Sequence, residues 1–411
     1  MSAISNDMQK KRFRLSYAQE RFLFIKQYEL DTNSHHIPVC VLLSEDVNKL
    51  KLIDALQCVV QRHEILRTRF IPDETGAYFQ EVSACESLLV EAQVEPKEFF
   101  YRVFDLERDI PLRAGFFENY LLIVIHHIAF DGWSVSLLRE EIWKHYDAKP
   151  VAPLEIQYKD FALWQRKIIE SQWGELKKYW QEKLTGIEPS QLPTDYARPF
   201  QIDYKGRSMK FDLPFEIQSF SKSHQVPPFV ICLTALGLLL SRYTGTEDIV
   251  IGTPVANRQH PQLASLIGLF VNTLVIRFNL TGNVGLLDTL HRVHRELIDV
   301  QRHQDMPFEK LVDALEVERD PSKHPIFQIM YTVEYVNEVE SENFFSNDAT
   351  QFDLNVSILL TPTQIKGQVK YATSLYKEET IKRFVGHYQR LLTEMLSSPE
   401  RLISQYTMLS S

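Results

Sequence analysis

An unbroken aliphatic run, Leu121–Ile125 (LLIVI), is the strongest constraint on the fold of this chain. A strand in which every residue is apolar is buried on both faces, so it belongs inside a sheet that other elements cover. Apolar residues with helical spacing follow it closely, at Val135, Leu138 and Ile142, which indicates a helix. Because helical and β-rich patterns alternate along the chain, we predict an α/β protein with mixed sheets.

The remaining patterns extend this prediction along the sequence. Ser16 and Gln19 have the spacing of a capping box at the start of a helix. The apolar run Phe229–Leu240 is shorter than the ~20 residues that a membrane-spanning helix needs, so it indicates a buried core helix. We expect helices over residues 16–27, 48–63, 134–146, 158–184, 217–243, 284–302 and 378–397, and strands over 38–43, 121–125, 249–252, 271–278, 327–335 and 367–374.

The length of 411 residues favours two or three domains or lobes, at about 150 residues each. Pro193, Pro199 and Gly206 interrupt regular structure in the middle of the chain. We therefore predict an N-terminal lobe over residues 1–185, a linker over 186–206 and a C-terminal lobe over 207–411.

Composition excludes several classes of protein. With 45 Lys and Arg against 54 Asp and Glu, the net charge is −9, so the chain lacks the positive surface that nucleic-acid binding requires. The four cysteines are far apart and form no C-x-x-C pair, which is typical of a reducing compartment. The polar, basic N-terminal residues show no apolar export signal. We expect a cytoplasmic monomer that binds neither nucleic acid nor membrane.

The segment His126–Ser134 (HHIAFDGWS) follows the buried strand directly and carries the most concentrated chemistry in the sequence. Reactive groups on a loop at the end of a rigid strand are a common catalytic arrangement. Successive strand residues point to opposite faces, so His126 and His127 are expected to have different roles, one facing a cavity and one packing inward. Asp131 would brace the loop if it found a cationic partner.

Other chemistries fit this segment less well. Adjacent histidines on a strand diverge and no clear third ligand follows them, so we expect no metal site. A serine hydrolase would need a G-x-S-x-G nucleophile elbow, and the sequence has none. A purely structural role is a common alternative for a histidine pair beside a strand, and His35-His36 is a candidate for such a pair.

The whole pattern resembles a known family. HHIAFDGWS matches the HHxxxDG signature of condensation domains from nonribosomal peptide synthetases, members of the chloramphenicol-acetyltransferase-like superfamily. Seven further segments resemble the other blocks of that family, in the family's order: LSYAQER (15–21), RHEILRTRF (62–70), YKDFALWQ (158–165), IGTPVANR (251–258), IGLFVNT (267–273), HQDMPFEKLV (303–312) and RDPSKHPIFQ (319–328). Phe22-Leu23-Phe24 and Lys323 depart slightly from the family pattern.

The resemblance implies two chloramphenicol-acetyltransferase-like lobes in a V-shaped pseudo-dimer, with an active-site tunnel between them. It also implies partners: upstream donor and downstream acceptor carrier proteins that deliver substrates on phosphopantetheine arms, and an adenylation domain in the same larger polypeptide. The family reaction is attack of the acceptor's α-amine on the donor's thioester, which gives an amide. The domain itself is expected to bind no cofactor or metal.

The resemblance assigns catalysis to His127, the second histidine of the signature. This imidazole is a candidate general base for the amine, a group that orients the amine, or a group that stabilises the oxyanion, and the sequence leaves all three roles open. Asp131 is expected to be structural and to pair with a buried arginine, because an unpaired buried carboxylate is costly. The candidate arginines are Arg62, Arg67 and Arg258.

The other residues of the signature have expected structural or contact roles. His126 is expected to support the active-site structure, and Gly132 to provide backbone freedom or close approach of a substrate. Trp133, Ser134 and Asn272 are candidate tunnel or substrate contacts. Core packing of Trp133 and a turn or capping role of Asn272 are the alternatives.

Two other kinds of activity are compatible with the same fold. One is ester formation or epimerisation; cyclisation is disfavoured because that subgroup replaces HHxxxD with a pattern that begins in Asp. The other is a catalytically silent module that recruits a partner enzyme. Silent modules usually lose the active-site histidine, and this chain retains it at position 127.

Overall fold

The computed structural model of the chain describes residues 12–28, 35–84, 90–91, 95–203, 205–282, 284–317, 320–335 and 350–408. These residues divide into two compact units. The first unit contains the described residues up to Gly174 and the distant segment Ala256–Asn272. The second contains Glu175–Val255 and the described residues from Thr273 onward.

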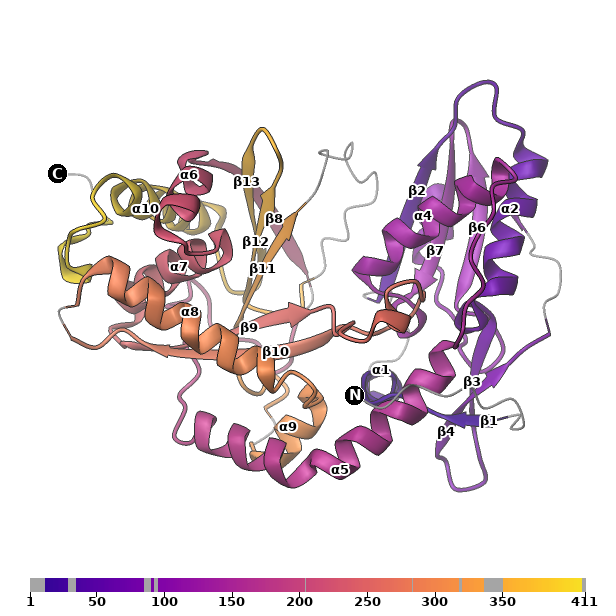
Figure 1. Cartoon of the computed structure of the whole chain (residues 1–411), viewed down its shortest axis with the longest axis horizontal. Coiled ribbons are helices and arrows are strands. Elements are labelled where there is room, and N and C mark those ends of the chain that lie inside the picture. Colours follow the sequence, from indigo (N-terminus) through magenta and orange to yellow (C-terminus); the bar gives the residue numbers. More distant parts are fainter. Residues whose placement is uncertain are drawn as a thin grey trace. The chain divides into compact units, whose positions relative to one another are not determined.

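The first unit is built around a four-stranded sheet of described residues with the strand order β2-β7-β6-β5. Its strands are β2 (His36–Leu42), β7 (Tyr120–His126), β6 (Leu112–Phe117) and β5 (Val90–Glu91). Residues Leu121–Ile125 of β7 are completely buried, which confirms the prediction of a strand covered on both faces. Helices α2 (Lys49–Arg62) and α4 (Gly132–Tyr146) lie side by side against this sheet (Figure 1).

Smaller elements complete the first unit. They are β1 (Arg12–Arg14), β3 (Thr68–Pro72) and β4 (Tyr78–Val82), which form a sheet in the order β1-β4-β3, with α1 (Tyr17–Tyr28), α3 (Pro96–Tyr101) and the 3-10 helices Glu64–Arg67, His127–Ala129 and Pro261–Leu263. The predicted capping box is present at α1, where the N–H of Ser16 donates to Oε1 of Gln19 and the N–H of Gln19 donates to Oγ of Ser16. Helix α5 (Tyr158–Leu184) has the predicted bounds and continues from the first unit into the second.

The second unit contains a mixed sheet whose described strands have the order β10-β9-β11-β12-β13-β8. The central strand β11 pairs in parallel with β9 and β12, whereas β13 is antiparallel to β12 and β8. The strands are β8 (Gly206–Leu213), β9 (Asp248–Val255), β10 (Asn272–Asn279), β11 (Ile329–Tyr335), β12 (Leu354–Leu360) and β13 (Ile365–Ala372). The helices are α6 (Glu216–His224), α7 (Pro228–Thr244), α8 (Leu286–Arg302), α9 (Phe308–Ala314), α10 (Glu378–Ser397) and the 3-10 helix Ile403–Gln405.

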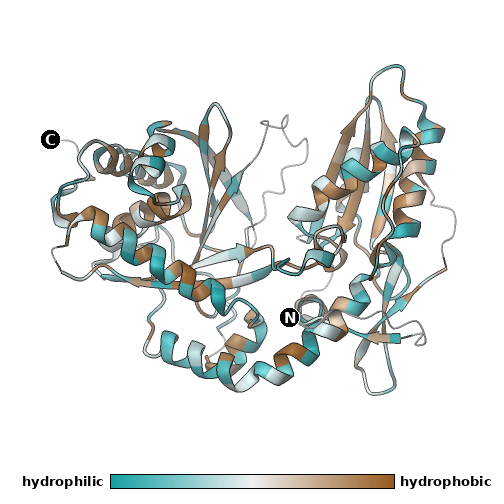
Figure 2. Cartoon of the chain, in the orientation of Figure 1, coloured by the Kyte–Doolittle hydropathy of each residue, from teal (hydrophilic) through white to brown (hydrophobic). Residues whose placement is uncertain are grey.

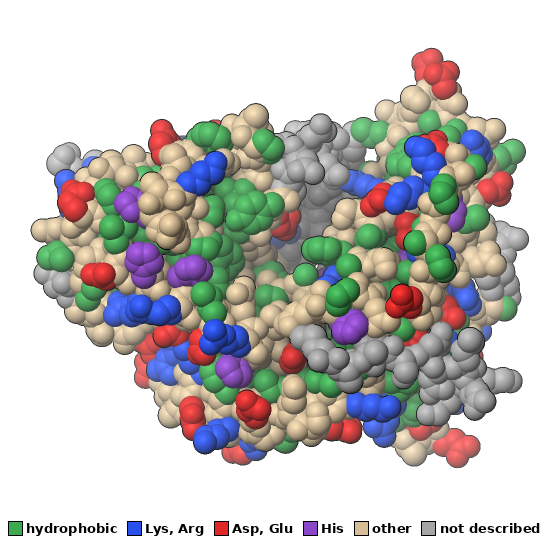
Figure 3. Space-filling model, in the orientation of Figure 1, with side chains coloured by type: hydrophobic (Ala, Val, Ile, Leu, Met, Phe, Trp, Pro, Cys, Tyr) green, Lys and Arg blue, Asp and Glu red, His purple; other side chains and the backbone are tan. Residues whose placement is uncertain are grey.

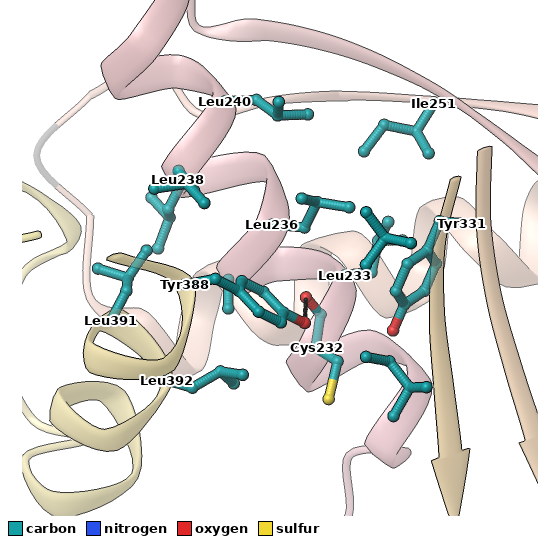
Figure 4. Close-up of a cluster of buried hydrophobic side chains, with 14 of the residues drawn as sticks. Cys232, Leu233, Leu236, Leu238, Leu240, Ile251, Tyr331, Tyr388, Leu391 and Leu392 are labelled. Carbon is teal, nitrogen blue, oxygen red and sulfur yellow. Dashed lines mark hydrogen bonds between the residues drawn. The ribbon is translucent and has the colours of Figure 1, made fainter. Parts of the chain in front are cut away.

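Helix α7 lies at the centre of the core of the second unit. Every residue from Val230 to Leu240 is buried, as the apolar run predicts. The hydroxyl of Tyr388 in α10 donates to the carbonyl oxygen of Cys232 (3.0 Å), and Leu391 and Leu392 lie on the same side of α7 (Figure 4). Among the described residues, no single helix is long and apolar enough to cross a membrane; only the bent pair α6 and α7, taken together, reaches that length and composition.

The prediction of a single helix over 217–243 is wrong, because the chain breaks there into α6 and α7. Gln225 ends α6 in the left-handed region, with φ of 54°. Pro227 and Pro228 then begin α7. Proline has no N–H to donate within a helix and disfavours the helical conformation of the residue before it, so a pair of prolines requires a new start.

The segment predicted as a linker, 186–206, is attached to the second unit through its described residues. The carboxylate of Asp195 accepts a hydrogen bond from the N–H of Lys377 (2.9 Å), the residue before α10. Arg198 binds Asp353 through both terminal guanidinium nitrogens. The lobe boundaries at residues 185 and 207 stay a prediction.

The distribution of hydrophobic and hydrophilic residues on the helices agrees with their packing. Helices α2, α4 and α8 each carry hydrophobic and hydrophilic residues around the axis (Figure 2), as expected of helices with one buried face.

Acidic and basic side chains are interspersed on the face of the molecule shown in Figure 3. Among the described residues of that face, such mixing gives no extended positive surface.

Candidate active site

The signature segment begins where β7 ends, and its first histidine is buried. His126 is the last residue of β7 and lies opposite His36 of β2. Its Nδ1 accepts a hydrogen bond from the N–H of Ile128 (3.0 Å), which starts the 3-10 turn His127–Ala129. The ring centroids of His36 and Phe104 are each 6.1 Å from that of His126. His126 therefore packs into an aromatic cluster in the interior of the unit.

His127 is a partly exposed residue whose backbone is fixed. Its N–H donates to the carbonyl oxygen of His35 (2.8 Å), and its own carbonyl oxygen accepts from the N–H of Phe130 (3.1 Å). Its Nδ1 is buried and forms no hydrogen bond of normal geometry with a described residue. The ring lies 5.3 Å from that of Phe22. The part of the ring that can meet a substrate therefore does not include Nδ1.

The surroundings of His127 favour its neutral form. The pKa of His127 is lowered from its ordinary value of 6.5, and burial is the largest cause. The guanidinium of Arg21 also lowers this pKa, whereas backbone groups and the Asp131 carboxylate raise it. Burial also lowers the pKa of His35 to about 3 and the pKa of His36 to about 4. These imidazoles are therefore neutral near pH 7, since burial penalises the charged form.

Asp131 joins the signature loop to helix α4 and to a distant arginine. It caps the N-terminus of α4, where its Oδ1 accepts from the N–H (3.0 Å) and the hydroxyl (2.7 Å) of Ser134. Nη2 of Arg258 donates to the two carboxylate oxygens at 3.0 and 3.2 Å, and the N–H of Phe270 donates to Oδ2 at 3.0 Å. The side chains of Arg258 and Asp131 are only 3% and 2% exposed. The ion pair is thus almost completely removed from water.

Of the three candidate arginines, Arg258 is the one that the structure brings to Asp131. Arg62 instead forms an ion pair with Glu141 (3.2 Å). Arg67 donates to the backbone carbonyl oxygen of Ser83, directly after β4. The guanidinium of Arg258 is also stacked on an aromatic ring, that of Phe270, at 4.1 Å from the centroid.

The segment Ala256–Asn272 is held in the first unit largely through its backbone. Arg258 donates from Nη1 to the carbonyl oxygens of Leu263 (2.7 Å) and Leu266 (2.6 Å). Other side chains of the unit bind further backbone groups of the segment. Trp133 donates to the carbonyl oxygen of Ala264 (3.2 Å), and Tyr158 donates to that of Leu269 (2.7 Å). His63 accepts from the N–H of Ile267 (3.3 Å), and Ser134 accepts from the N–H of Gly268 (3.1 Å). These bonds fix the path of the segment next to the signature loop.

Tyr158 is a positioning residue that the sequence patterns do not identify. Its ring packs so closely on Gly268 that a Cβ atom there would come within 2.2 Å of the tyrosine ring. Its hydroxyl also lies 2.8 Å from Oγ of Ser16, which caps α1. Burial raises the pKa of Tyr158, so the hydroxyl keeps its proton and donates to Leu269. One side chain thus connects α1, α5 and the segment Ala256–Asn272.

Two other buried residues brace the same region and were not predicted. Nε2 of Gln19 donates to the carbonyl oxygen of Ile128 in the turn His127–Ala129 (3.3 Å). Nε2 of His63 lies 2.8 Å from the carboxylate of Glu141, while its Nδ1 accepts from Ile267. Both residues fall in sequence blocks that resemble the family, LSYAQER and RHEILRTRF, and that membership is the signal that could have identified them.

The remaining residues of the signature differ in accessibility. Ser134 is completely buried rather than open to a substrate, because its hydroxyl is used by Asp131 and by the N–H of Gly268. Gly132 is exposed and has no positive φ, so the backbone does not require glycine there. Trp133 is 50% exposed and is not a core residue, whereas Asn272 is buried at the start of β10.

The site therefore offers acid–base chemistry by the imidazole of His127 on a rigid turn. In the described part of the chain, no group of three or more His, Cys, Asp and Glu side chains is arranged to hold a metal ion. The Asp131–Arg258 ion pair and its hydrogen bonds to backbone groups of residues 263–270 are buried. Their contribution is to hold the turn in place.

The sequence and the fold of this chain are similar to those of known proteins. A family model described as "Condensation domain" matches residues 9–411, so the chain belongs to the condensation-domain family. Malpinin synthetase of Mortierella alpina is 32% identical over 441 residues, which cover 96% of this chain and 6% of that protein. The dimodular nonribosomal peptide synthase of Bacillus subtilis (strain 168) is 32% identical over 456 residues, which cover 99% of this chain and 19% of that protein. The chain thus spans less than a fifth of the length of these two curated relatives.

Solved structures of lower sequence identity share the fold. The X-domain in its complex with OxyB from teicoplanin biosynthesis has a TM-score of 0.89 at 24% identity, over 100% of this chain and 99% of that one. The condensation domain of the monacolin K polyketide synthase MokA has a TM-score of 0.83 at 20% identity, over 95% and 99% of the two chains. The predicted family and α/β fold class are confirmed.

Proposed function

We propose that this chain forms an amide bond between two substrates that carrier proteins deliver on phosphopantetheine arms. The α-amine of the acceptor attacks the thioester carbonyl of the donor. The observation that carries this proposal is His127, a partly exposed residue with a neutral imidazole on a turn whose backbone is fixed on both sides. The family and the relatives, which include a dimodular nonribosomal peptide synthase, support the same reaction.

The reaction asks little of the protein beyond positioning and one proton transfer. A free α-amine has an ordinary pKa of about 7.7–8.0, so a useful fraction is nucleophilic near neutrality. Holding both tethered substrates in reacting geometry is worth about 7–11 kcal/mol of the barrier. A general base adds typically about 10²–10⁴-fold. Few charged catalytic groups are needed for this chemistry.

In the proposed step, Nε2 is the reacting nitrogen of His127, because Nδ1 is buried. It accepts the proton that the amine loses while the new C–N bond forms at the thioester carbonyl. The tetrahedral intermediate then collapses, the C–S bond breaks, and the sulfur leaves with a proton as the free thiol of the donor's arm. The product is an amide on the acceptor's arm, and His127 returns to its neutral form.

Asp131 and Arg258 act on this chemistry only through structure. Their carboxylate and guanidinium are committed to each other and to backbone groups of residues 263–270. The pair fixes the end of the turn that starts at His127, because Asp131 also begins helix α4. Loss of either side chain would therefore release the turn rather than remove a reacting group.

The test uses the full chain with two carrier proteins, one loaded with a donor aminoacyl group and one with an acceptor. Mass spectrometry of the carriers detects the new amide. Wild-type protein should transfer the donor to the acceptor, and His127→Ala should reduce the rate by about 10²–10⁴-fold. Thermal unfolding of the two proteins should be similar, since His127 makes its hydrogen bonds through the backbone.

His291→Ala is the matched control, because His291 lies on the exposed face of α8 in the second unit. It should keep the wild-type rate. If His127→Ala also kept that rate, the catalytic assignment would be overturned while the fold remained. If the wild type formed no amide with any loaded pair, the proposed function itself would fail.

A second candidate function is recruitment of a partner enzyme without catalysis. The observation that favours it is the likeness to an X-domain whose structure was solved in complex with OxyB. The two candidates predict different results in the same assay, because a recruiting module gives no new amide from loaded carriers. Epimerisation would instead give an unchanged mass and an inverted stereocentre, which chiral analysis of the released residue detects.

A further inference from the structure

The ring of Phe22 contacts two histidine rings of the first unit. Phe22 belongs to α1, and its ring centroid lies 5.3 Å from that of His127, with an angle of 30° between the ring planes. Its centroid is also 4.9 Å from that of His35, at an angle of 87°. The small angle to His127 means that Phe22 covers part of one face of that imidazole, whereas Phe22 and His35 meet edge to face.

The position of Phe22 relative to the turn His127–Ala129 is fixed by its own helix. Gln19, three residues earlier in α1, lies on the same face of the helix as Phe22. The side chain of Gln19 donates to the carbonyl oxygen of Ile128 in that turn (3.3 Å). Leu23, the next residue of the helix, is buried in the core of the unit. One face of α1 is therefore attached to the turn that carries His127.

The hydrogen bonds of His127 fix its backbone but not its ring. The N–H of His127 donates to the carbonyl oxygen of His35, and its carbonyl oxygen accepts from the N–H of Phe130. A histidine in acid–base chemistry is usually oriented by a hydrogen bond to its second ring nitrogen. Here Nδ1 is buried and forms no hydrogen bond of normal geometry with a described residue. Packing has to set the orientation of the imidazole instead, and the ring of Phe22 is in contact with it.

The same contact bears on the charge of the imidazole. Burial is the largest cause of the lowered pKa of His127, and an aromatic ring over one face contributes to burial because it replaces water. The carboxylate of Asp131 raises this pKa and the guanidinium of Arg21 lowers it. His35 faces the same ring, and positive charges on the two imidazoles disfavour each other. Removal of Phe22 would leave these groups in place and admit water to the uncovered face.

We propose that Phe22 is a positioning residue for His127: its ring covers one face of the imidazole, keeps Nε2 turned toward the substrate and excludes water from that face. The edge-to-face contact with His35 holds the ring of Phe22 in turn. The catalytic part of this inference rests on the proposed function, because it takes His127 as the general base. The ring contact itself is independent of the reaction.

The direct test follows the titration of His127 by NMR on the full chain, with the histidine rings labelled with carbon-13. The signal of His127 is identified by its loss in His127→Ala. Phe22→Ala should raise the pKa of His127 toward its ordinary value of 6.5, because water reaches the uncovered face. Phe22→Leu, which keeps an apolar side chain without a ring, should give a midpoint between those of Phe22→Ala and the wild type.

The second measurement is the rate of amide formation with loaded carriers. Phe22→Ala should lower kcat by about 10–10²-fold, since a displacement of a reacting group by about 1 Å is enough for a loss of this size. KM for the carriers should stay close to the wild-type value, because Phe22 acts through His127. Phe22→Leu should recover part of the lost rate.

Phe116→Ala is the matched control. Phe116 is a partly exposed phenylalanine that packs against the same core, and it pairs with Leu121 at the end of β7 away from His126. Its replacement removes the same ring and should change neither the titration of His127 nor kcat. Thermal unfolding of both alanine variants shows how much stability each ring contributes, so a general loss of stability is distinguished from a specific effect on His127.

An unchanged midpoint in both Phe22 variants would overturn the positioning role, as would an unchanged kcat in Phe22→Ala. If Phe22→Ala did not fold, the midpoint of Phe22→Leu would decide in the same way. If the midpoint rose but the wild type formed no amide with any loaded pair, the contact would stand and the proposed function would fail.

Discussion

The N–H of Phe270 donates to the carboxylate of Asp131 at 3.0 Å across 139 positions of sequence. This bond joins the segment Ala256–Asn272 to the loop that carries His127. The same carboxylate neutralises the buried guanidinium of Arg258. One side chain therefore joins the signature loop to the segment Ala256–Asn272, and its replacement is expected to have a large effect.

Asp131→Asn should destabilise the protein by about 3–5 kcal/mol, because it leaves the guanidinium of Arg258 buried without its counter-ion. Urea unfolding followed by circular dichroism measures this change. Glu378→Gln is the control, since Glu378 pairs with Arg207 at the surface, where both side chains are more than half exposed; it should change the stability by less than about 1 kcal/mol. Equal effects of the two substitutions would contradict the structural role of Asp131.

Gly268→Ala should destabilise the first unit by about 1–3 kcal/mol, since the new methyl group would collide with the ring of Tyr158. The substitution should also slow amide formation, because the N–H of Gly268 binds Ser134 next to Asp131. The cost should shrink in a Tyr158→Leu background, which removes the ring. A double-mutant cycle by urea unfolding measures this coupling, and strictly additive effects would exclude the contact.

The stability of the protein should depend on pH through His35 and His36. Their pKa values in the folded chain are about 3 and about 4, below the ordinary value of 6.5. Between about pH 6.5 and pH 4 the unfolded chain therefore binds more protons than the folded chain. The contribution of these two histidines to the free energy of unfolding is fully present above pH 6.5. It falls as the pH drops below this value, by up to about 1.4 kcal/mol per pH unit for each histidine.

Urea unfolding at several pH values between 7 and 4 measures this slope. His36→Gln should flatten it, because one of the two buried imidazoles is removed. His291→Gln, on the exposed face of α8, is compared in the same series. An equal flattening by His291→Gln would show that the slope does not come from the buried cluster.

The advantage of the wild type over His127→Ala in the rate of amide formation should persist below pH 6.5, because burial lowers the pKa of His127. Protonation of the acceptor α-amine, whose ordinary pKa is about 7.7–8.0, slows both proteins alike. The neutral imidazole is the active form in the proposed step, so the ratio of the two kcat values should fall only when the pH drops below the lowered pKa of His127. Measurements of kcat with saturating loaded carriers give the midpoint of this fall, and a midpoint above pH 6.5 would contradict the assignment.

Local signals made much of the fold predictable. The run Leu121–Ile125 predicted the buried strand β7 because its composition alone requires cover on both faces. The bounds of α5 and α10 were predicted because apolar residues recur at helical spacing up to the ends of both helices. The break between α6 and α7 was missed although Pro227 and Pro228 mark it, since the apolar pattern continues across the prolines.

The candidate site was less predictable because its contacts are distant in sequence. Asp131 was expected to find an arginine, but the choice of Arg258 depends on where residues 256–272 lie, and no local pattern carries that information. Burial of Ser134 and exposure of Trp133 next to it follow from the orientation of the first turn of α4. A sequence motif identifies such residues but does not indicate which of them face outward.

The assignment of Ala256–Asn272 to the first unit, between strands β9 and β10 of the second, has a consequence for dissecting the protein. No single cut in the chain separates the two units into complete pieces. A fragment that ends near residue 185 would keep the histidine loop and lose the guanidinium that balances it. Swaps of one half between relatives would have to carry this inserted stretch along with the half that it serves.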